Sequence, residues 1–318
     1  MNAATETSES FAAPATAPRP VRPFYWSVMR ELWENRSLII APLVVGGFVL
    51  FVLIASAINT SHQVQEFAAV PPQLQGRVAT WAYGIVAWVI SVVMHITVFF
   101  YLLDALQGER KDRSVLFWKS MPVSDTTTVL AKMFTALVIS GAIVIVVADA
   151  TQLALMLLAS VIFMFGGASP AAIWTQAELG QMTVVIIYWQ IAIALWYAPV
   201  AAWLLFVSAW AKRVAILWAL LPPIALIVFE RVVFRTRHIQ DMINARMDDP
   251  VLATFVKGAR GVHLTIGDET VATPMAGRVL DGIDPVAFMA NPWLWVGLVV
   301  AAGLVAGAIW MRRYREPI

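Results

Sequence analysis

The stretch Ser37–Ile58, SLIIAPLVVGGFVLFVLIASAI, contains 22 residues and no charged side chain. An α-helix rises about 1.5 Å per residue, so a helix of this length crosses the roughly 30 Å hydrocarbon core of a bilayer. The stretch therefore predicts a membrane-spanning helix, and this prediction sets the fold class.

Five further segments have the same apolar character, which gives six predicted spans in all. They are Trp81–Leu103, Met133–Phe165, Met182–Trp210, Val214–Val233 and Pro292–Met311. The fifth is the weakest, because Pro222 and Pro223 interrupt it and its uncharged part is short. We predict an all-α integral membrane protein that passes through the bilayer several times.

The composition of the whole chain agrees with this class. Of 318 residues, 60% are hydrophobic and only 13% are charged, whereas a soluble domain carries roughly 25% charged residues. The surplus apolar surface must face lipid. A net charge of +2 gives no support for a nucleic-acid partner, and the absence of cysteine excludes disulfides and thiolate metal sites.

The N-terminal region divides into two parts. Residues 1–23 are rich in Ala, Pro, Thr, Ser and Glu and lack a secretory signal pattern, so we expect a disordered cytoplasmic tail. Phe24–Arg36 mixes aromatic and charged residues, which favours an amphipathic helix on the membrane surface. A simple extension of the first span is the alternative.

Lys and Arg predict the orientation. If the N-terminus is inside, both short outer loops together contain only Arg77. Fourteen Lys and Arg then lie on the cytoplasmic side: Arg19, Arg22, Arg30, Arg36, Arg110, Lys111, Arg113, Lys119, Lys132, Lys212, Arg213, Arg312, Arg313 and Arg315. Because basic residues accumulate in cytoplasmic loops, we expect both termini inside. The long segment 234–291 is then extracytoplasmic, with a possible hairpin around Ile266-Gly267-Asp268.

The cytoplasmic loop Gln107–Lys132, QGERKDRSVLFWKSMPVSDTTTVLAK, carries the functional signal. A dense run of both charge signs precedes Val115–Trp118, four large apolar residues, and Pro122–Asp125 then breaks the chain before the third span. Ser124 or Asp125 can cap the helix that follows. Aromatic residues with a charged rim are typical of a protein docking surface, and equally of an interfacial helix on anionic lipid.

This pattern resembles the cytoplasmic loop of type-2 ATP-binding-cassette permeases, in which a Glu-Arg run is followed by Gly-Thr, an apolar stretch and Pro-Val-Ser. The chain departs from it at Arg113, where the family has Gly, and at Leu116, where an acidic residue is common. In that family the loop forms a coupling helix that contacts the ATPase subunit. The resemblance assigns this contact to Glu109, Arg110, Arg113, Ser114, Leu116, Phe117, Trp118, Pro122 and Ser124.

The resemblance implies a permease domain over residues 24–318 and an exporter subunit of the bacterial cytoplasmic (inner) membrane. Its implied partners are two copies of an ATP-binding-cassette ATPase subunit and a second permease copy, as a homodimer or heterodimer. No Gly-x-x-x-x-Gly-Lys-Ser/Thr phosphate loop occurs in the sequence. We therefore expect no catalytic residues and no cofactor in this chain, with ATP and Mg on the partner subunit.

Asp149 and His95 are ionisable residues in the interior of the predicted spans, whereas Glu230 and Arg231 lie at the outer boundary of the fifth. A carboxylate in hydrocarbon is costly, so Asp149 should face a cavity or a hydrogen-bond partner. It either contacts substrate on the translocation path or fastens helices, with His95 or Gln152 as the partner. His95 has the same two interpretations, and no metal site is expected.

Two other classes stay open at this stage. An ion-driven secondary transporter would need charged networks across several spans, and the sequence offers only Asp149 and His95. A non-transporting scaffold or assembly factor with a permease-like fold is the other alternative. The substrate is not indicated by the sequence.

Overall fold

The structure is a computed structural model that describes residues 22–57, 65, 69–112, 123–176, 179–248, 262–266, 269–273 and 283–314. Most of these residues are helical, and the two strands among them form one short hairpin. The elements are α1 Pro23–Glu34, α2 Ser37–Ala57, α4 Pro72–Asp104, α5 Gln107–Lys111, α7 Asp125–Phe134, η1 Thr135–Ile139, α8 Ser140–Phe165, α9 Ala171–Gln176, α10 Leu179–Trp196, α11 Ala198–Trp210, α12 Ala215–Phe229, η2 Glu230–Phe234, α13 His238–Asp248, β1 Val262–Ile266, β2 Glu269–Thr273, α15 Pro285–Met289 and α16 Pro292–Tyr314.

Among the described residues, six helical segments are long and apolar enough to cross a membrane, as the sequence predicts. They are Ser37–Ser56, Val78–Lys111, Asp125–Phe165, Leu179–Trp196, Ala215–Phe234 and Pro292–Tyr314. The predicted fourth span, Met182–Trp210, is divided: α10 ends at Trp196 and the shorter α11 begins at Ala198. Pro199 explains the break, because it has no N–H to continue the helical ladder.

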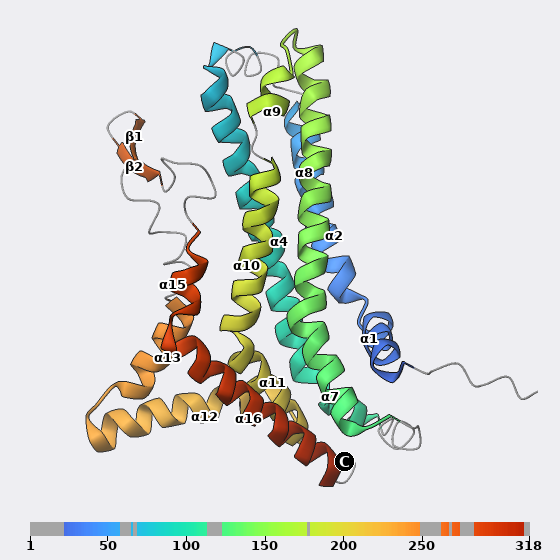
Figure 1. Cartoon of the computed structure of the whole chain (residues 1–318), viewed down its shortest axis with the longest axis vertical. Helices are drawn as coiled ribbons and strands as arrows, with labels where there is room; N and C mark the ends of the chain where they lie inside the picture. Colours follow the sequence, from blue (N-terminus) through green and yellow to red (C-terminus); the bar gives the residue numbers. More distant parts are fainter. Residues whose placement is uncertain are drawn as a thin grey trace, which may run out of the picture.

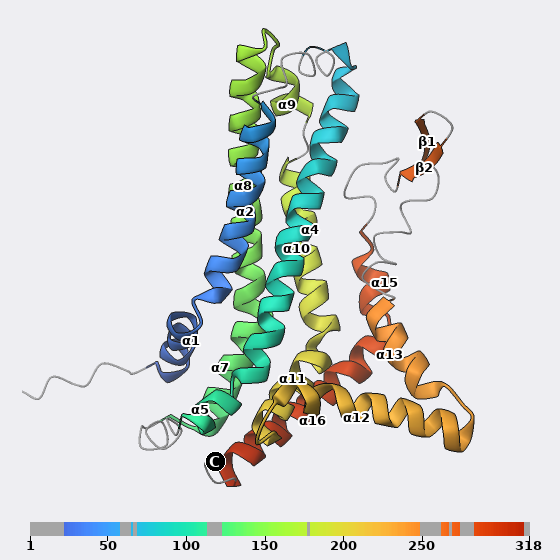
Figure 2. The same ribbon diagram turned by 180° about the vertical axis from the view of Figure 1, so that it is seen from behind.

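The helices form two groups (Figures 1 and 2). α2, α4, α8 and α10 lie side by side, and α7 and η1 continue α8 at its N-terminal end. The end of this bundle at which α7 lies is crossed by α11, α12 and α16. The most extensive packing of α16 is against α11. A β-carbon at Gly307 of α16 would lie only 3.0 Å from Phe206 of α11, so glycine permits this close approach.

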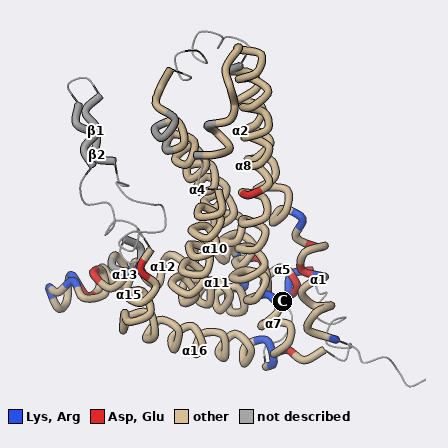
Figure 3. Tube along the Cα trace, turned by 45° about the horizontal axis from the view of Figure 1, so that its top comes forward, with Lys and Arg blue, Asp and Glu red and all other residues tan. Residues whose placement is uncertain are grey.

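Charged residues are concentrated away from the long bundle helices (Figure 3). They gather around α1, α5 and the C-terminal end of α16, with a second group beside α13. Most of the large apolar side chains on α2 and α12 are exposed, among them Phe48 and Phe51 at 64%. This is the distribution expected of a protein whose apolar helix faces contact lipid.

The N-terminal segment forms a helix of its own rather than an extension of the first span. α1 ends at Glu34, and Asn35 leaves the helical conformation before α2 begins at Ser37. Its aromatic residues Tyr25, Trp26 and Trp33 are exposed, whereas its opposite face packs against α7. α1 is therefore anchored to the bundle at the end where α7 lies.

The segment between α12 and α16 contains the hairpin that the sequence predicts. β1 and β2 pair antiparallel, and Ile266 lies opposite Glu269. α13 begins at His238 because the carboxylate of Glu230 accepts hydrogen bonds from the backbone N–H groups of His238 and Ile239, each at 2.7 Å. This carboxylate satisfies two of the unpaired donors at the helix start.

The proline pair in α12 creates a contact that joins α11 to α12. Pro223 has no N–H, so the carbonyl of Ala219, four residues earlier, lacks its intrahelical partner. The indole Nε1–H of Trp203 on α11 donates to this oxygen at 3.0 Å. A tertiary hydrogen bond thus replaces the one that proline removes.

We predict that Trp203→Phe lowers the free energy of unfolding by roughly 1 kcal/mol, because the Ala219 carbonyl loses its donor. Thermal unfolding of the detergent-solubilised protein measures this. In the Pro223→Ala background residue 223 can donate to Ala219 itself, so the same Trp203→Phe change should cost less. Equal costs in both backgrounds would contradict this account of the contact.

Candidate functional site

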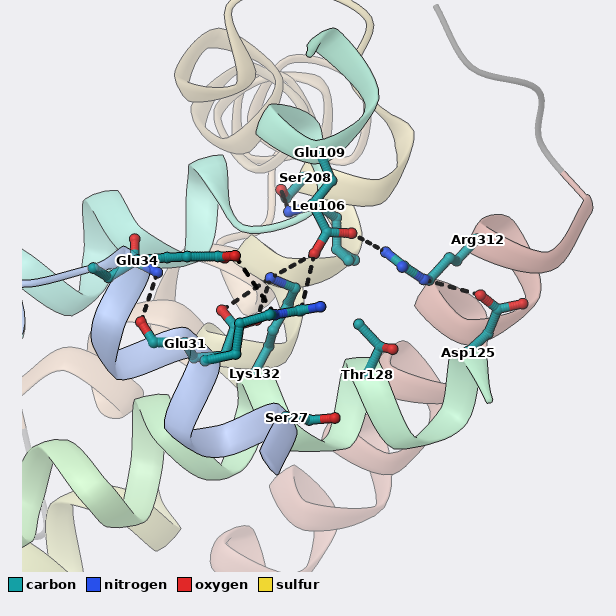
Figure 4. Close-up of polar contacts among 12 residues, drawn as sticks. Ser27, Glu31, Glu34, Leu106, Glu109, Asp125, Thr128, Lys132, Ser208 and Arg312 are labelled. Carbon is teal, nitrogen blue, oxygen red and sulfur yellow. Dashed lines mark hydrogen bonds and ion pairs between the residues drawn. The ribbon is translucent and has the colours of Figure 1, made fainter. Parts of the chain in front are cut away.

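A cluster of charged residues joins four helices at the end of the bundle where the 107–132 loop begins and ends (Figure 4). We call it the ionic cluster and define it as Arg30 and Glu31 of α1, Glu109 of α5, Asp125 and Lys132 of α7, and Arg312 of α16. Its members come from parts of the sequence up to 282 residues apart (312 − 30). The cluster therefore exists only in the folded chain.

Lys132 is the centre of the ionic cluster. Its Nζ lies 2.9 Å from each carboxylate oxygen of Glu31 and 3.1 Å from Oε1 of Glu109. The side chains of Lys132 and Glu31 are only 3% and 1% exposed. The hydroxyl of Tyr101 also donates to Glu31, at 2.9 Å. Lys132 thus connects α7 to both α1 and α5 in a site shielded from water.

Arg312 extends the ionic cluster to α16. Its Nη1 pairs with Oε2 of Glu109, and its Nε lies 3.0 Å from Oδ1 of Asp125. Glu109 therefore lies between Lys132 and Arg312, and its side chain is 9% exposed. Because Lys132 and Arg312 both pair with this buried carboxylate, and Arg30 lies near it as well, Glu109 can remain ionised in a poorly solvated position.

Arg30 completes the cluster from α1. Its Nη2 lies 2.8 Å from Glu31 and 3.4 Å from Glu109. Burial acts to lower the pKa of Arg30, but the hydrogen bond and charge of Glu31, together with Glu109 and Glu34, raise it above its ordinary value. In Glu34, which is half exposed, burial raises the pKa and the charge of Arg30 opposes the increase.

Arg110 anchors the start of the loop to α11. Its Nη2 donates to the backbone carbonyls of Ser208 and Ala211, each at 2.7 Å. Ser208 Oγ in turn accepts from the backbone N–H groups of Leu106, at 2.9 Å, and Gln107, at 3.0 Å, at the start of α5. The two helix ends cap each other, so α5 and α11 are fastened together.

The structure gives different outcomes for the predicted loop residues. Glu109 and Arg110 are buried in contacts within the chain, so in this conformation their side chains do not form an outer docking face. Ser124 caps α7, as predicted, by accepting from the N–H of Thr127 at 3.0 Å. The remaining predicted contacts lie outside the described residues: Arg113, Ser114, Leu116, Phe117, Trp118 and Pro122.

Sequence reasoning missed the main members of the ionic cluster. Lys132 and Arg312 entered only the count of basic residues that predicts the orientation in the membrane, and Glu31 entered only as part of the predicted surface helix. None of the three was assigned a role in a site. One signal was present: Lys132 follows Val129, Leu130 and Ala131 and precedes an apolar run. A lone cation at such a position needs a partner, but the sequence does not say which carboxylate supplies it.

A second feature is a pair of adjoining hollows beside α4, which we call the groove. One hollow of about 390 Å³ lies among α4, η1, α10 and α11, and another of about 310 Å³ lies between α4 and α10. They share Trp88, Trp189 and Gln190 as lining residues. Together they follow α4 from Thr80 to Leu102, which corresponds to roughly 33 Å of helix, about the thickness of the hydrocarbon core.

His95 and Asp149, the two ionisable residues in the interior of the predicted spans, lie in different surroundings. His95 lines the larger hollow. Asp149 lines neither hollow, and its Oδ1 accepts from the hydroxyl of Thr183 on α10 at 3.1 Å. The expected partners of Asp149, His95 and Gln152, are replaced by Thr183. This bond fastens α8 to α10, which is the helix-fastening interpretation of Asp149.

Comparisons with known proteins gave no match among family models, curated proteins or solved structures. Within the part of the chain that the structure describes, no group of three or more His, Asp or Glu residues is arranged to hold a metal ion.

We predict that Lys132→Met destabilises the protein by roughly 3 kcal/mol, the lower end of the cost of removing one partner of a buried ion pair, because Arg30 and Arg312 still neutralise Glu31 and Glu109. Thermal unfolding in detergent measures it. Lys212→Met, at an exposed lysine, is the matched control and should change little. Adding Glu109→Gln to Lys132→Met should restore part of the loss. Equal stability of the two Lys→Met variants would contradict the central position of Lys132.

Proposed function

We propose that the chain is the membrane-spanning permease subunit of an ATP-driven exporter, and that a separate ATP-binding subunit drives it through the 107–132 loop. The proposal includes both termini on the cytoplasmic side of a bacterial inner membrane. ATP and Mg then bind to the partner, of which two copies assemble with two permease chains. No catalytic step is assigned to this chain.

The ionic cluster is the observation that carries this proposal. Glu109 belongs to the segment that enters the loop, and Asp125 and Lys132 belong to the segment that leaves it. The same ion pairs hold α1 and α16. A force applied to the loop would therefore act on α1, α7 and α16 together, since buried ion pairs resist separation. This is the mechanical linkage that a coupling loop requires.

The groove supports a transport role independently. Two adjoining hollows, which together follow α4 over about the length of the hydrocarbon core, offer space for a translocated molecule. α10 and α11 meet at a break beside Pro199, where a change in helix direction would open or close the larger hollow. Tyr197 at the break and Val200 just after it both line that hollow.

The resemblance of the loop sequence to the coupling loop of type-2 ATP-binding-cassette permeases supports an ATP-binding subunit as the partner. Because Glu109 and Arg110 are engaged within the chain, we assign direct contact with the ATPase to the Ser114–Pro122 part. Glu109 and Arg110 are then the residues that transmit the movement to the bundle.

We predict that replacing Phe117 and Trp118 together by Ala leaves membrane insertion and thermal stability unchanged but abolishes binding of the ATP-binding subunit and vanadate-sensitive transport. Co-purification and transport in vesicles measure the two effects. Phe165→Ala, at a 90% exposed aromatic at the end of α8, is the control. Normal ATPase binding and transport in the Phe117 and Trp118 variant would overturn the coupling assignment.

Asp149→Asn separates this proposal from an ion-driven transporter. Asparagine can accept the Thr183 hydrogen bond without a charge, so we expect transport and its pH dependence to be unchanged. Thr183→Val, which removes the donor, should lower stability by roughly 1 kcal/mol instead. Loss of transport in a stable Asp149→Asn protein would favour ion coupling.

A further inference from the structure

The larger hollow contains a histidine whose hydrogen-bonding state is fixed by its own helix. Nδ1 of His95 lies 2.6 Å from the backbone carbonyl oxygen of Ser91, one turn earlier on α4. A carbonyl oxygen can only accept, so Nδ1 must carry the hydrogen in this contact. The proton of a neutral ring is thereby placed on Nδ1, and Nε2 is left as an acceptor.

The surroundings of His95 favour the neutral ring. No carboxylate contacts it among the described residues, and the hollow that it lines is bounded by Trp88, Phe99 and Leu102. An imidazolium without a counter-ion in such a site would be costly. Nε2 has no hydrogen-bond partner within the described chain, so an acceptor is left open on a residue that lines the hollow.

Gln190 provides a second open acceptor in the same hollow. Its Nε2 donates to Oγ of Ser91 at 2.9 Å, which fixes the orientation of the amide. Its Oε1 has no partner among the described residues. Gln190 also lines the smaller hollow and is therefore at the junction of the two. Two acceptors on facing helices, α4 and α10, are thus available to a donor group on whatever occupies the groove.

We propose that the groove binds a neutral, largely aromatic or aliphatic molecule that donates one N–H or O–H hydrogen bond to Nε2 of His95. This inference rests on the proposed function only in treating the occupant as cargo. A volume of about 390 Å³ lies within the range of small-molecule sites, roughly 300–1,000 Å³. The lining residues of both hollows include no acidic side chain, so a cationic ligand would lack a counter-charge.

Two matched probes test this inference on the purified permease chain in detergent, without the ATPase. Carbazole is aromatic, neutral and has one N–H donor, and N-methylcarbazole lacks only that donor. Equilibrium dialysis at a fixed detergent concentration, with empty micelles as the blank, gives both affinities. We expect carbazole to bind about tenfold more tightly to the native chain, the effect of one hydrogen bond in an apolar site.

Variants of the chain test whether the preference for carbazole depends on His95 in the larger hollow. In His95→Phe the preference for carbazole should fall to about one, whereas His95→Gln, which keeps an acceptor, should retain it. Thr97→Val changes a residue of the same helix that does not line the hollow, and it should leave both affinities unchanged. Ala194→Phe fills the larger hollow without altering His95 and should weaken both probes at least tenfold.

Equal affinities of the two probes for the native chain, absence of binding by either, or an undiminished preference in a folded His95→Phe protein would each overturn the inference. Should His95→Phe fail to fold, the preference of the native chain for carbazole and the weaker binding of both probes to Ala194→Phe decide the question. Binding without ATPase-coupled transport would contradict the proposed function alone. Coupled transport without donor-dependent binding would contradict this inference alone.

Discussion

The buried pairing of Lys132 with Glu31 and Glu109 is the constraint on which the architecture of the loop end depends. Three ionised groups that are almost fully shielded from water can persist only if each neutralises another at hydrogen-bond distance. Because the partners lie on α1, α5 and α7, the requirement fixes these helices relative to one another. Arg312 adds α16 through the same carboxylate of Glu109. Separating the four helices would expose or orphan a buried charge, so they respond to a force as a unit.

Elsewhere the structure is shaped by the need to pair backbone groups where water is scarce. Pro223 leaves the Ala219 carbonyl without its helical donor, and Trp203 supplies one. Arg110 and Ser208 pair the free groups at the meeting of α5 and α11. In each case a local deficit is met by a specific side chain, and the deficit dictates which surfaces come together.

The groove and the ionic cluster are connected through α4 and α11. α4 lines both hollows and ends just before α5, which carries Glu109. α11 lines the larger hollow and receives Arg110 at its C-terminal end. Movement of the loop would therefore reach the hollow through two helices that the described contacts hold together. Under the proposed function, this is the route from the driving subunit to the cargo.

The sequence by itself determined the six apolar helices and limited the cap of α7 to Ser124 or Asp125, and it indicated the hairpin before α16, because hydrophobic length, turn residues and capping chemistry are local properties. The structure then decided that α1 is a helix separate from the first span. The sequence also placed Glu109 and Arg110 in an important loop. Only the tertiary structure showed that Glu31, Lys132 and Arg312 meet them, that Asp149 pairs with Thr183, and that His95 faces a hollow. The reason is physical: an ion pair or a cavity depends on which distant helices pack together, and the apolar helices carry near-uniform faces that do not specify their neighbours.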